Sequence, residues 1–97
     1  MTAIRWTRRA HRHLQAVWEY VAADNPTTAE ELVQQIWDSI AILATHPLLG
    51  RVGRIEGSRE LVVPGTPYIV GYDLRNDSVR ILAIVHSSRN WPIAFSR

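Results

Sequence analysis

The 97-residue sequence contains no cysteine and no lysine. Without cysteine, neither a disulfide framework nor a thiolate metal site can form, so packing must stabilise the fold and a reducing cytoplasm is the expected setting. The longest strongly apolar run, Ile81 to Val85, is far shorter than the roughly 18 residues of a membrane-spanning helix. No signal-peptide pattern follows the arginine-rich start. We therefore expect a soluble cytoplasmic protein that does not enter a membrane.

Because lysine is missing, all eleven basic side chains are arginines, and they are unevenly distributed. Residues 1–13 hold four arginines and no acid, residues 14–50 hold five acids and no arginine, and residues 51–97 hold seven arginines and four acids. The planar guanidinium group suits carboxylates and phosphates, so this distribution indicates an acidic partner, either polypeptide or nucleic acid. A G+C-rich genome, whose codons favour arginine over lysine, explains the missing lysines equally well.

The four N-terminal arginines, Arg5, Arg8, Arg9 and Arg12, have two interpretations. They can neutralise nucleic-acid phosphates, the dominant sequence-independent contribution to such binding. Alternatively, Arg8 and Arg12 are four residues apart and share one solvent-facing surface of a helix. We favour the solvated helix face.

Apolar residues at helical spacing predict two helices joined by a short turn. The first spans residues 8 to about 23, where Asp24-Asn25-Pro26 breaks the pattern. Thr27 or Thr28 is predicted to cap the second helix, because a glutamate follows each of them three residues later. The second helix is expected to end near Thr45. So short a connection predicts an antiparallel helical hairpin.

Alternating apolar and polar residues predict the strands of a sheet. A short strand is expected at Ala3–Thr7, and three more at Arg59–Val63, Tyr68–Leu74 and Val79–His86. The last of these is apolar on both faces, which predicts a central, covered position. Residues 47–58 have three glycines and no regular period, so we expect an exposed loop there. The sequence thus predicts a single α+β domain over residues 1–97, with an N-terminal strand and a helical hairpin packed on a mostly antiparallel sheet.

The histidines near the N-terminus do not make a convincing metal site. His11 and His13 are two residues apart, and on a helix such side chains point to different faces. Only in an extended segment would they face the same way, and no carboxylate nearby completes a ligand set. We therefore predict no metal and no cofactor.

A second group of residues offers candidate chemistry. Arg59, His86 and Arg89 form a candidate catalytic set, with Arg51 and Arg54 as candidate target-binding cations. A metal-free ribonuclease needs a base for the 2′-hydroxyl, an acid for the leaving oxygen and cations for the charged phosphorane. Histidine can supply the proton transfer and arginine the charge stabilisation.

The same side chains also have a purely structural interpretation, which we favour. In it, Arg59 pairs with a carboxylate such as Glu60 or Glu56. His86 caps the end of its strand, and Trp91 packs the tail against the core. Convergence of the candidate set is not assured, since antiparallel neighbours can place Arg59 and His86 at different ends of the sheet.

An ordered set of short motifs extends along most of the chain. It comprises Gly50-Arg51, Gly53-Arg54, Arg59-Glu60-Leu61-Val62, Pro67-Tyr68-Ile69-Val70, Tyr72, and His86 followed by Arg89, Trp91 and Pro92. Together with Trp6-Thr7 and Ala10 ahead of the two amphipathic segments, this set resembles the RelE/ParE superfamily of bacterial toxins from type II toxin-antitoxin modules. The resemblance covers about residues 4–92 and implies the same α+β architecture.

The resemblance also implies a partner. Toxins of this superfamily are silenced by a cognate antitoxin, whose acidic and partly disordered segment folds around the toxin in a hetero-oligomeric complex. An arginine-rich surface with exposed aromatic side chains suits such coupled folding and binding. Trp18, Trp37 and Trp91 are the candidate antitoxin contacts, although we favour core positions for all three.

Two activities divide the superfamily that the chain resembles. RelE-like members cleave mRNA on the ribosome with basic residues of the sheet, whereas ParE-like members inhibit DNA gyrase and lack that catalytic set. This chain has no lysine for the lysine-bearing RelE site, and no tyrosine follows its last predicted strand. The resemblance therefore favours a growth-inhibiting, ParE-like toxin that binds gyrase. The alternative is a ribosome-dependent mRNA endonuclease that uses Arg59, His86 and Arg89.

Overall fold

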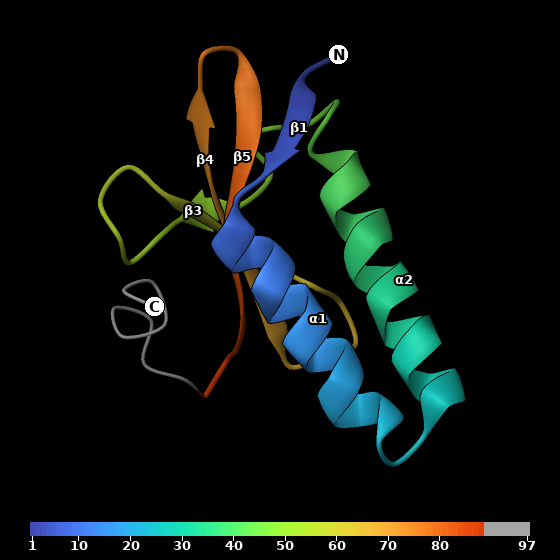
Figure 1. Cartoon of the computed structure of the whole chain (residues 1–97). Coiled ribbons are helices and arrows are strands. Elements are labelled where there is room, and N and C mark those ends of the chain that lie inside the picture. Colours follow the sequence, from blue (N-terminus) through green and yellow to red (C-terminus); the bar gives the residue numbers. More distant parts are fainter. Residues whose placement is uncertain (89–97) are drawn as a thin grey trace.

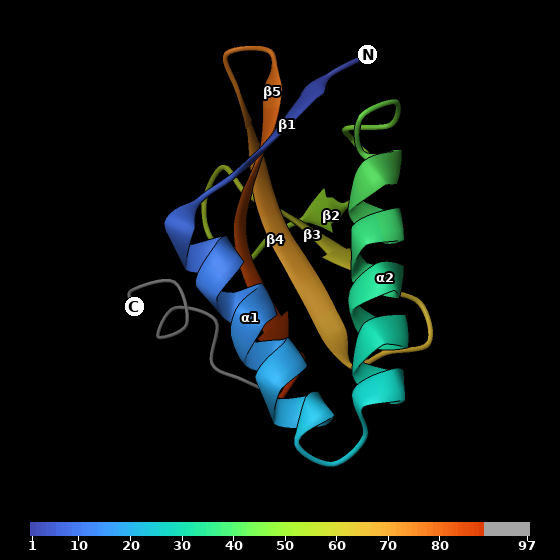
Figure 2. The same cartoon turned by 45° about the vertical axis from the view of Figure 1, so that its right-hand side comes forward.

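The computed structural model describes residues 1–88, which form two helices and a five-stranded sheet. The elements are β1 (Ala3–Trp6), α1 (Arg8–Ala22), α2 (Pro26–Ile42), β2 (Arg51–Val52), β3 (Arg59–Val62), β4 (Tyr68–Arg75) and β5 (Ser78–His86). The strand order is β1-β5-β4-β3-β2, with β1 parallel to β5 and the other neighbours antiparallel. In Figure 1 and Figure 2 the two helices lie antiparallel and side by side against the sheet. The predicted α+β architecture is confirmed.

Both helices begin at a polar capping residue. The Thr7 side chain accepts a hydrogen bond from the backbone N–H of Ala10 (3.1 Å) and caps α1. At α2 the cap is Asn25, whose side chain accepts from the Thr28 N–H (3.1 Å). The prediction that Thr27 or Thr28 caps this helix is wrong, because Pro26 is suited to the first helical position and the capping role moves to the residue before it.

The main core lies between the helices and the face of the sheet that they cover. Its fully buried side chains include Ile36 and Ile40 from α2 and Val79 and Ile81 from β5. Removing each such side chain from water contributes about 1.5–3 kcal/mol. The covered position that was predicted for the last strand is confirmed, since β5 lies between β1 and β4 and is buried along most of its length.

The segment between the second helix and the third strand differs from its prediction. Residues 51 and 52 form β2, which pairs with the first two residues of β3 (Arg51 with Glu60, Val52 with Arg59). A two-residue strand is too short to produce a detectable alternation. The helix before this segment is also shorter than predicted, because it ends at Ile42 and the chain turns over residues 43–45.

The loop of residues 47–50 is fastened to the sheet by two side chains. The fully buried Tyr72 donates its hydroxyl hydrogen to the Pro47 carbonyl (2.8 Å) and accepts from the Gly50 N–H (2.8 Å). Burial raises the pKa of the Tyr72 hydroxyl, so the group stays protonated and able to donate. Gly50 is required here, because a Cβ atom would lie 2.7 Å from the Tyr72 ring. Arg59 completes the attachment by donating to the Gly50 carbonyl (2.7 Å).

We expect Tyr72→Phe to lower the free energy of unfolding by about 1–3 kcal/mol, because it leaves the Gly50 N–H and the Pro47 carbonyl without their shared partner. Chemical denaturation measures the change. Tyr20→Phe is the matched control, since Tyr20 is 81% exposed and its hydroxyl should matter by less than about 0.5 kcal/mol. Equal stability of the Tyr72→Phe and Tyr20→Phe proteins would contradict the bridging role.

Candidate functional site

The candidate catalytic residues Arg59 and His86 lie at opposite ends of the sheet. Arg59 is opposite Tyr72 of β4, which in turn pairs with Ile81 of β5, whereas His86 pairs with Tyr68. Along the strand direction, Arg59 and His86 are therefore separated by five residues of β5, which corresponds to roughly 16 Å. Arg89, the third member of the candidate set, lies outside the described residues.

Arg59 is committed to the main chain. Its guanidinium donates to the carbonyls of Gly50 (2.7 Å) and Leu48 (3.4 Å). It does not pair with Glu60, as the structural interpretation expected, because adjacent residues of a strand point to opposite faces of a sheet. The side chain of Arg59 is on the Tyr72 face, and that of Glu60 is on the other.

His86 is held at the end of β5 by local contacts. Its Nδ1 atom accepts a hydrogen bond from the Ser88 N–H (3.2 Å) and lies 2.8 Å from the Ser88 hydroxyl. The imidazole packs edge-on against the Tyr68 ring, with the ring centroids 5.6 Å apart. These contacts match the predicted capping of the strand end.

Arg51 and Arg54, the candidate target-binding cations, converge on a carboxylate inside the protein. Glu60 is 2% exposed and accepts from Arg51 Nη2 (3.1 Å), from the Arg54 backbone N–H (2.8 Å) and from Arg54 Nη2 (3.4 Å). Burial by itself raises the pKa of the Glu60 carboxyl. The hydrogen bonds from Arg54 and Arg51 and the charge of Arg54 outweigh it, so the pKa lies below its usual value.

A second acid–arginine pair lies on the same face of the sheet as Glu60. Asp73 of β4 and Arg80 of β5 are directly opposite each other, and the guanidinium makes two hydrogen bonds to the carboxylate (2.7 and 3.0 Å). The hydrogen bond to Asp73 raises the pKa of Arg80. The sequence interpretation missed this pair. The sequence could have predicted it, because Asp73 and Arg80 are equally far from the turn between β4 and β5 and are therefore paired across the hairpin.

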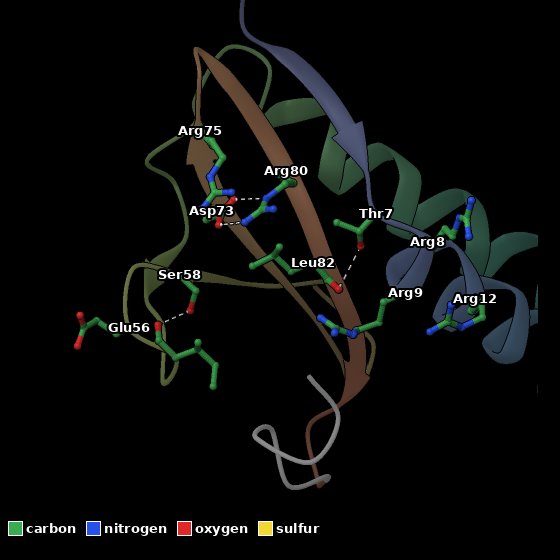
Figure 3. A pocket seen from close by; sticks show the side chains of 11 residues that line it. Thr7, Arg8, Arg9, Arg12, Glu56, Ser58, Asp73, Arg75, Arg80 and Leu82 are labelled. Carbon is green, nitrogen blue, oxygen red and sulfur yellow. Dashed lines mark hydrogen bonds and ion pairs between the residues drawn. The ribbon is translucent and has the colours of Figure 1, made fainter. Parts of the chain in front are cut away.

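Next to this pair lies a pocket of about 650 Å³, which we call the basic pocket. It is lined by Thr7, Arg8, Arg9, Arg12, Ile55, Glu56, Ser58, Asp73, Arg75, Arg80 and Leu82. Figure 3 shows that the arginines come from two directions, three from the start of α1 and two from the strands. The solvated helix face that was favoured for Arg8 and Arg12 is therefore one wall of a concave site.

The tryptophans are more exposed than predicted. Trp18 of α1 is 41% exposed and lines an apolar pocket of about 250 Å³ with His11, Leu14, Gln15 and Val33. Trp37 of α2 is 45% exposed, although its ring lies 4.8 Å from that of Trp6. The favoured core position is wrong for both, because each remains partly exposed to solvent. Trp91 lies outside the described residues.

No metal cluster or membrane span is present in the part of the chain that the structure describes. Residues 1–88 contain no group of three or more histidine, aspartate or glutamate side chains that could hold a metal ion. His13 instead accepts a hydrogen bond from the Ile84 N–H (3.2 Å). None of the helices in this region is long and apolar enough to cross a membrane.

Comparison with known proteins points to one group of bacterial proteins. Residues 4–91 match the sequence profile of the family described as the ParE toxin of the type II toxin-antitoxin system parDE. The protein Y4kP of Sinorhizobium fredii, whose name calls it a toxin, is 42% identical over 89 residues, which cover 92% of each chain. Toxin RelE2 of Caulobacter vibrioides is 29% identical over 89 residues, which cover 92% of this chain and 99% of the relative.

Solved structures share the same arrangement of helices and strands. A chain of the chromosomal ParDE system of P. aeruginosa superposes with a TM-score of 0.80 at 27% identity, covering 89% of this chain and 96% of that one. A chain of the RelBE2 toxin-antitoxin complex of Mycobacterium tuberculosis has a TM-score of 0.60 at 24% identity, with 88% and 96% covered. The second likeness concerns the fold alone.

We expect Glu60→Gln to lower the free energy of unfolding near neutral pH by about 1–3 kcal/mol, because two guanidinium groups lose their shared counter-charge. The pKa of Glu60 is depressed in the folded state, so its stabilising contribution is complete above the usual glutamate pKa. It is lost as the pH falls through the lowered value. Denaturation at several pH values should therefore show a smaller acid-range loss of stability in Glu60→Gln than in the parent.

Glu56→Gln serves as the control, since Glu56 is exposed in the loop that precedes β3. Its pH dependence should match that of the parent. A parent-like acid profile in Glu60→Gln would mean that the two arginines draw no stability from this carboxylate.

Proposed function

The chain belongs to the ParE toxin family of type II toxin-antitoxin systems, and we propose that it stops growth by binding DNA gyrase, with no chemistry of its own. One observation carries the proposal. The candidate catalytic residues Arg59 and His86 are about five residues apart along the sheet, so they do not meet at one phosphate. Acid–base catalysis requires its groups within hydrogen-bond reach of the same reacting atoms.

The electrostatics of the sheet support the same proposal. A ribonuclease needs cations that are available for the charge that develops on the phosphate. Arg51 and Arg54 are paired with Glu60, and Arg80 is paired with Asp73. Each of these cations already has a carboxylate partner, and phosphate would have to compete with it. Such pairing favours a surface that recognises a protein over one that cleaves RNA.

Cleavage of mRNA on the ribosome is the second candidate function. It is favoured by the likeness to toxin RelE2 of Caulobacter vibrioides, which covers almost the whole of both chains. In that case His86 would act in proton transfer and Arg89 in charge stabilisation. Both candidate targets are cytoplasmic, and we propose that the chain acts there as a single domain of residues 1–97.

As a type II toxin the protein has a cognate antitoxin, and we propose that Trp18 is one of its contacts. Partly exposed tryptophans in apolar pockets are frequent energetic centres of protein interfaces. Trp18 is 41% exposed beside an apolar pocket that both helices line. Trp37 has a comparable exposure, but part of its ring area is used against Trp6.

In a supercoiling assay with purified gyrase, we expect stoichiometric toxin to block supercoiling or to accumulate cleaved DNA. His86→Ala and Arg89→Ala toxins should remain active at equal folded concentration, because neither residue performs chemistry. Unimpaired supercoiling would overturn the proposal. If these variants no longer arrest growth, and if their rate of mRNA cleavage on translating ribosomes falls by about a hundredfold or more, the results would instead support the mRNA endonuclease.

We expect Trp18→Ala to weaken antitoxin binding by about 2 kcal/mol, or roughly thirtyfold, as measured by calorimetric titration. Tyr20→Ala is the matched control, because Tyr20 is an exposed aromatic residue of the same helix that does not line the pocket. Equal affinities of the two variants would place the antitoxin contact elsewhere.

A further inference from the structure

The basic pocket carries more positive charge than its own acids neutralise. Five arginines and two acids, Glu56 and Asp73, contribute to its lining. Asp73 is paired with Arg80. Within residues 1–88, Arg8, Arg12 and Arg75 form no ion pair, and their guanidinium groups are left to solvent. Arginines gathered in a concave site without internal partners are suited to an anionic ligand.

The start of α1 adds to this positive potential. The N-terminus of a helix carries a partial positive charge, so acids stabilise its first turn and cations destabilise it. The first turn of α1 contains no acid and instead begins with Arg8 and Arg9. The local sequence thus opposes the helix dipole at the place where the pocket opens. Local conflicts of this kind are expected at functional sites.

The rest of the lining indicates the class of the ligand. Ile55 and Leu82 contribute aliphatic surface, and none of the described residues that line the pocket is aromatic. Single-stranded nucleic acids are usually bound by aromatic side chains on which bases stack. The hydroxyl groups of Thr7 and Ser58 already donate to main-chain carbonyls (2.8 and 2.6 Å). The guanidinium groups of Arg8, Arg12 and Arg75 are therefore the main donors that remain for a ligand, beside a small aliphatic surface.

From these features we infer that the basic pocket is the docking site for an acidic segment of the antitoxin, in which carboxylates flank one aliphatic side chain. The carboxylates pair with Arg8, Arg12 and Arg75, since guanidinium groups bind carboxylates through two parallel hydrogen bonds. The aliphatic side chain packs on Leu82 and Ile55. The site is separate from the apolar pocket at Trp18, so the antitoxin would hold the toxin at two chemically different points.

The inference rests on the toxin-antitoxin function but not on the choice between gyrase and mRNA. It can be tested with a fluorescein-labelled peptide in which glutamates flank a central leucine, by fluorescence anisotropy with the full-length toxin. The peptide should bind, and its affinity should fall with added salt, because the contacts are ionic. A peptide with glutamine in place of every glutamate should bind at least tenfold more weakly.

A triple variant, Arg8→Gln with Arg12→Gln and Arg75→Gln, should lose roughly tenfold or more of the peptide affinity. It should also be at least as stable as the parent in chemical denaturation, because two cations leave the first turns of α1. Arg5→Gln is the control for net charge, since Arg5 is exposed on β1 but does not line the pocket. It should change the affinity by no more than about twofold.

Three results would overturn the inference. The first is equal peptide binding by the triple variant and by Arg5→Gln. The second is tighter binding of a single-stranded oligonucleotide than of the peptide at equal net charge, which would assign the pocket to nucleic acid. The third is unchanged binding when glutamine replaces glutamate. Because the assay contains neither gyrase nor ribosomes, its failure would leave the proposed toxin target untouched.

Discussion

The hydroxyl group of the buried Tyr72 connects β4, in the middle of the sheet, to the loop of residues 47–50. The arginine-rich segment that contains Arg51 and Arg54 follows this loop. By bonding to both Pro47 and Gly50, the Tyr72 hydroxyl holds the loop that directly precedes β2. The register of β2 against β3 sets Arg51 opposite Glu60. The positions of the candidate target-binding arginines thus depend on a contact at the edge of the hydrophobic core.

Two acids of the second half of the chain hold arginine side chains in place on the sheet. Glu60 and Asp73 lie on the face of the sheet away from the helices, and each pairs with arginine from a neighbouring strand or loop. The protein as a whole is basic, but the positive charges of Arg51, Arg54 and Arg80 are compensated by these two carboxylates. Arg8 and Arg12 of α1 and Arg75 of β4 line the basic pocket and form no ion pair within residues 1–88.

Sequence periodicity was sufficient for the helices and for β1, β3, β4 and β5, because each is long enough to repeat its pattern of burial. It failed for β2, which has two residues, and for the cap of α2, where Pro26 displaced the capping role to Asn25. The candidate site was harder to predict than the fold, because the ion pairs depend on strand register and on the face of the sheet that each side chain occupies. Arg59 and Glu60 are adjacent in sequence and therefore lie on opposite faces, a distinction that composition cannot supply.

The parallel pairing of β1 with β5 also has a consequence for how the toxin forms. Ala3 is opposite Ser78, and the Thr7 hydroxyl bonds to the Ile81 carbonyl (2.8 Å). In the described part of the chain, β1 thus has no partner until β5 has been made. Contacts so distant in sequence form late in folding, because the intervening chain must be ordered first. The five-stranded sheet, with the basic pocket beside it, therefore forms only after β5 has been synthesised, and translation products that end before β5 lack it.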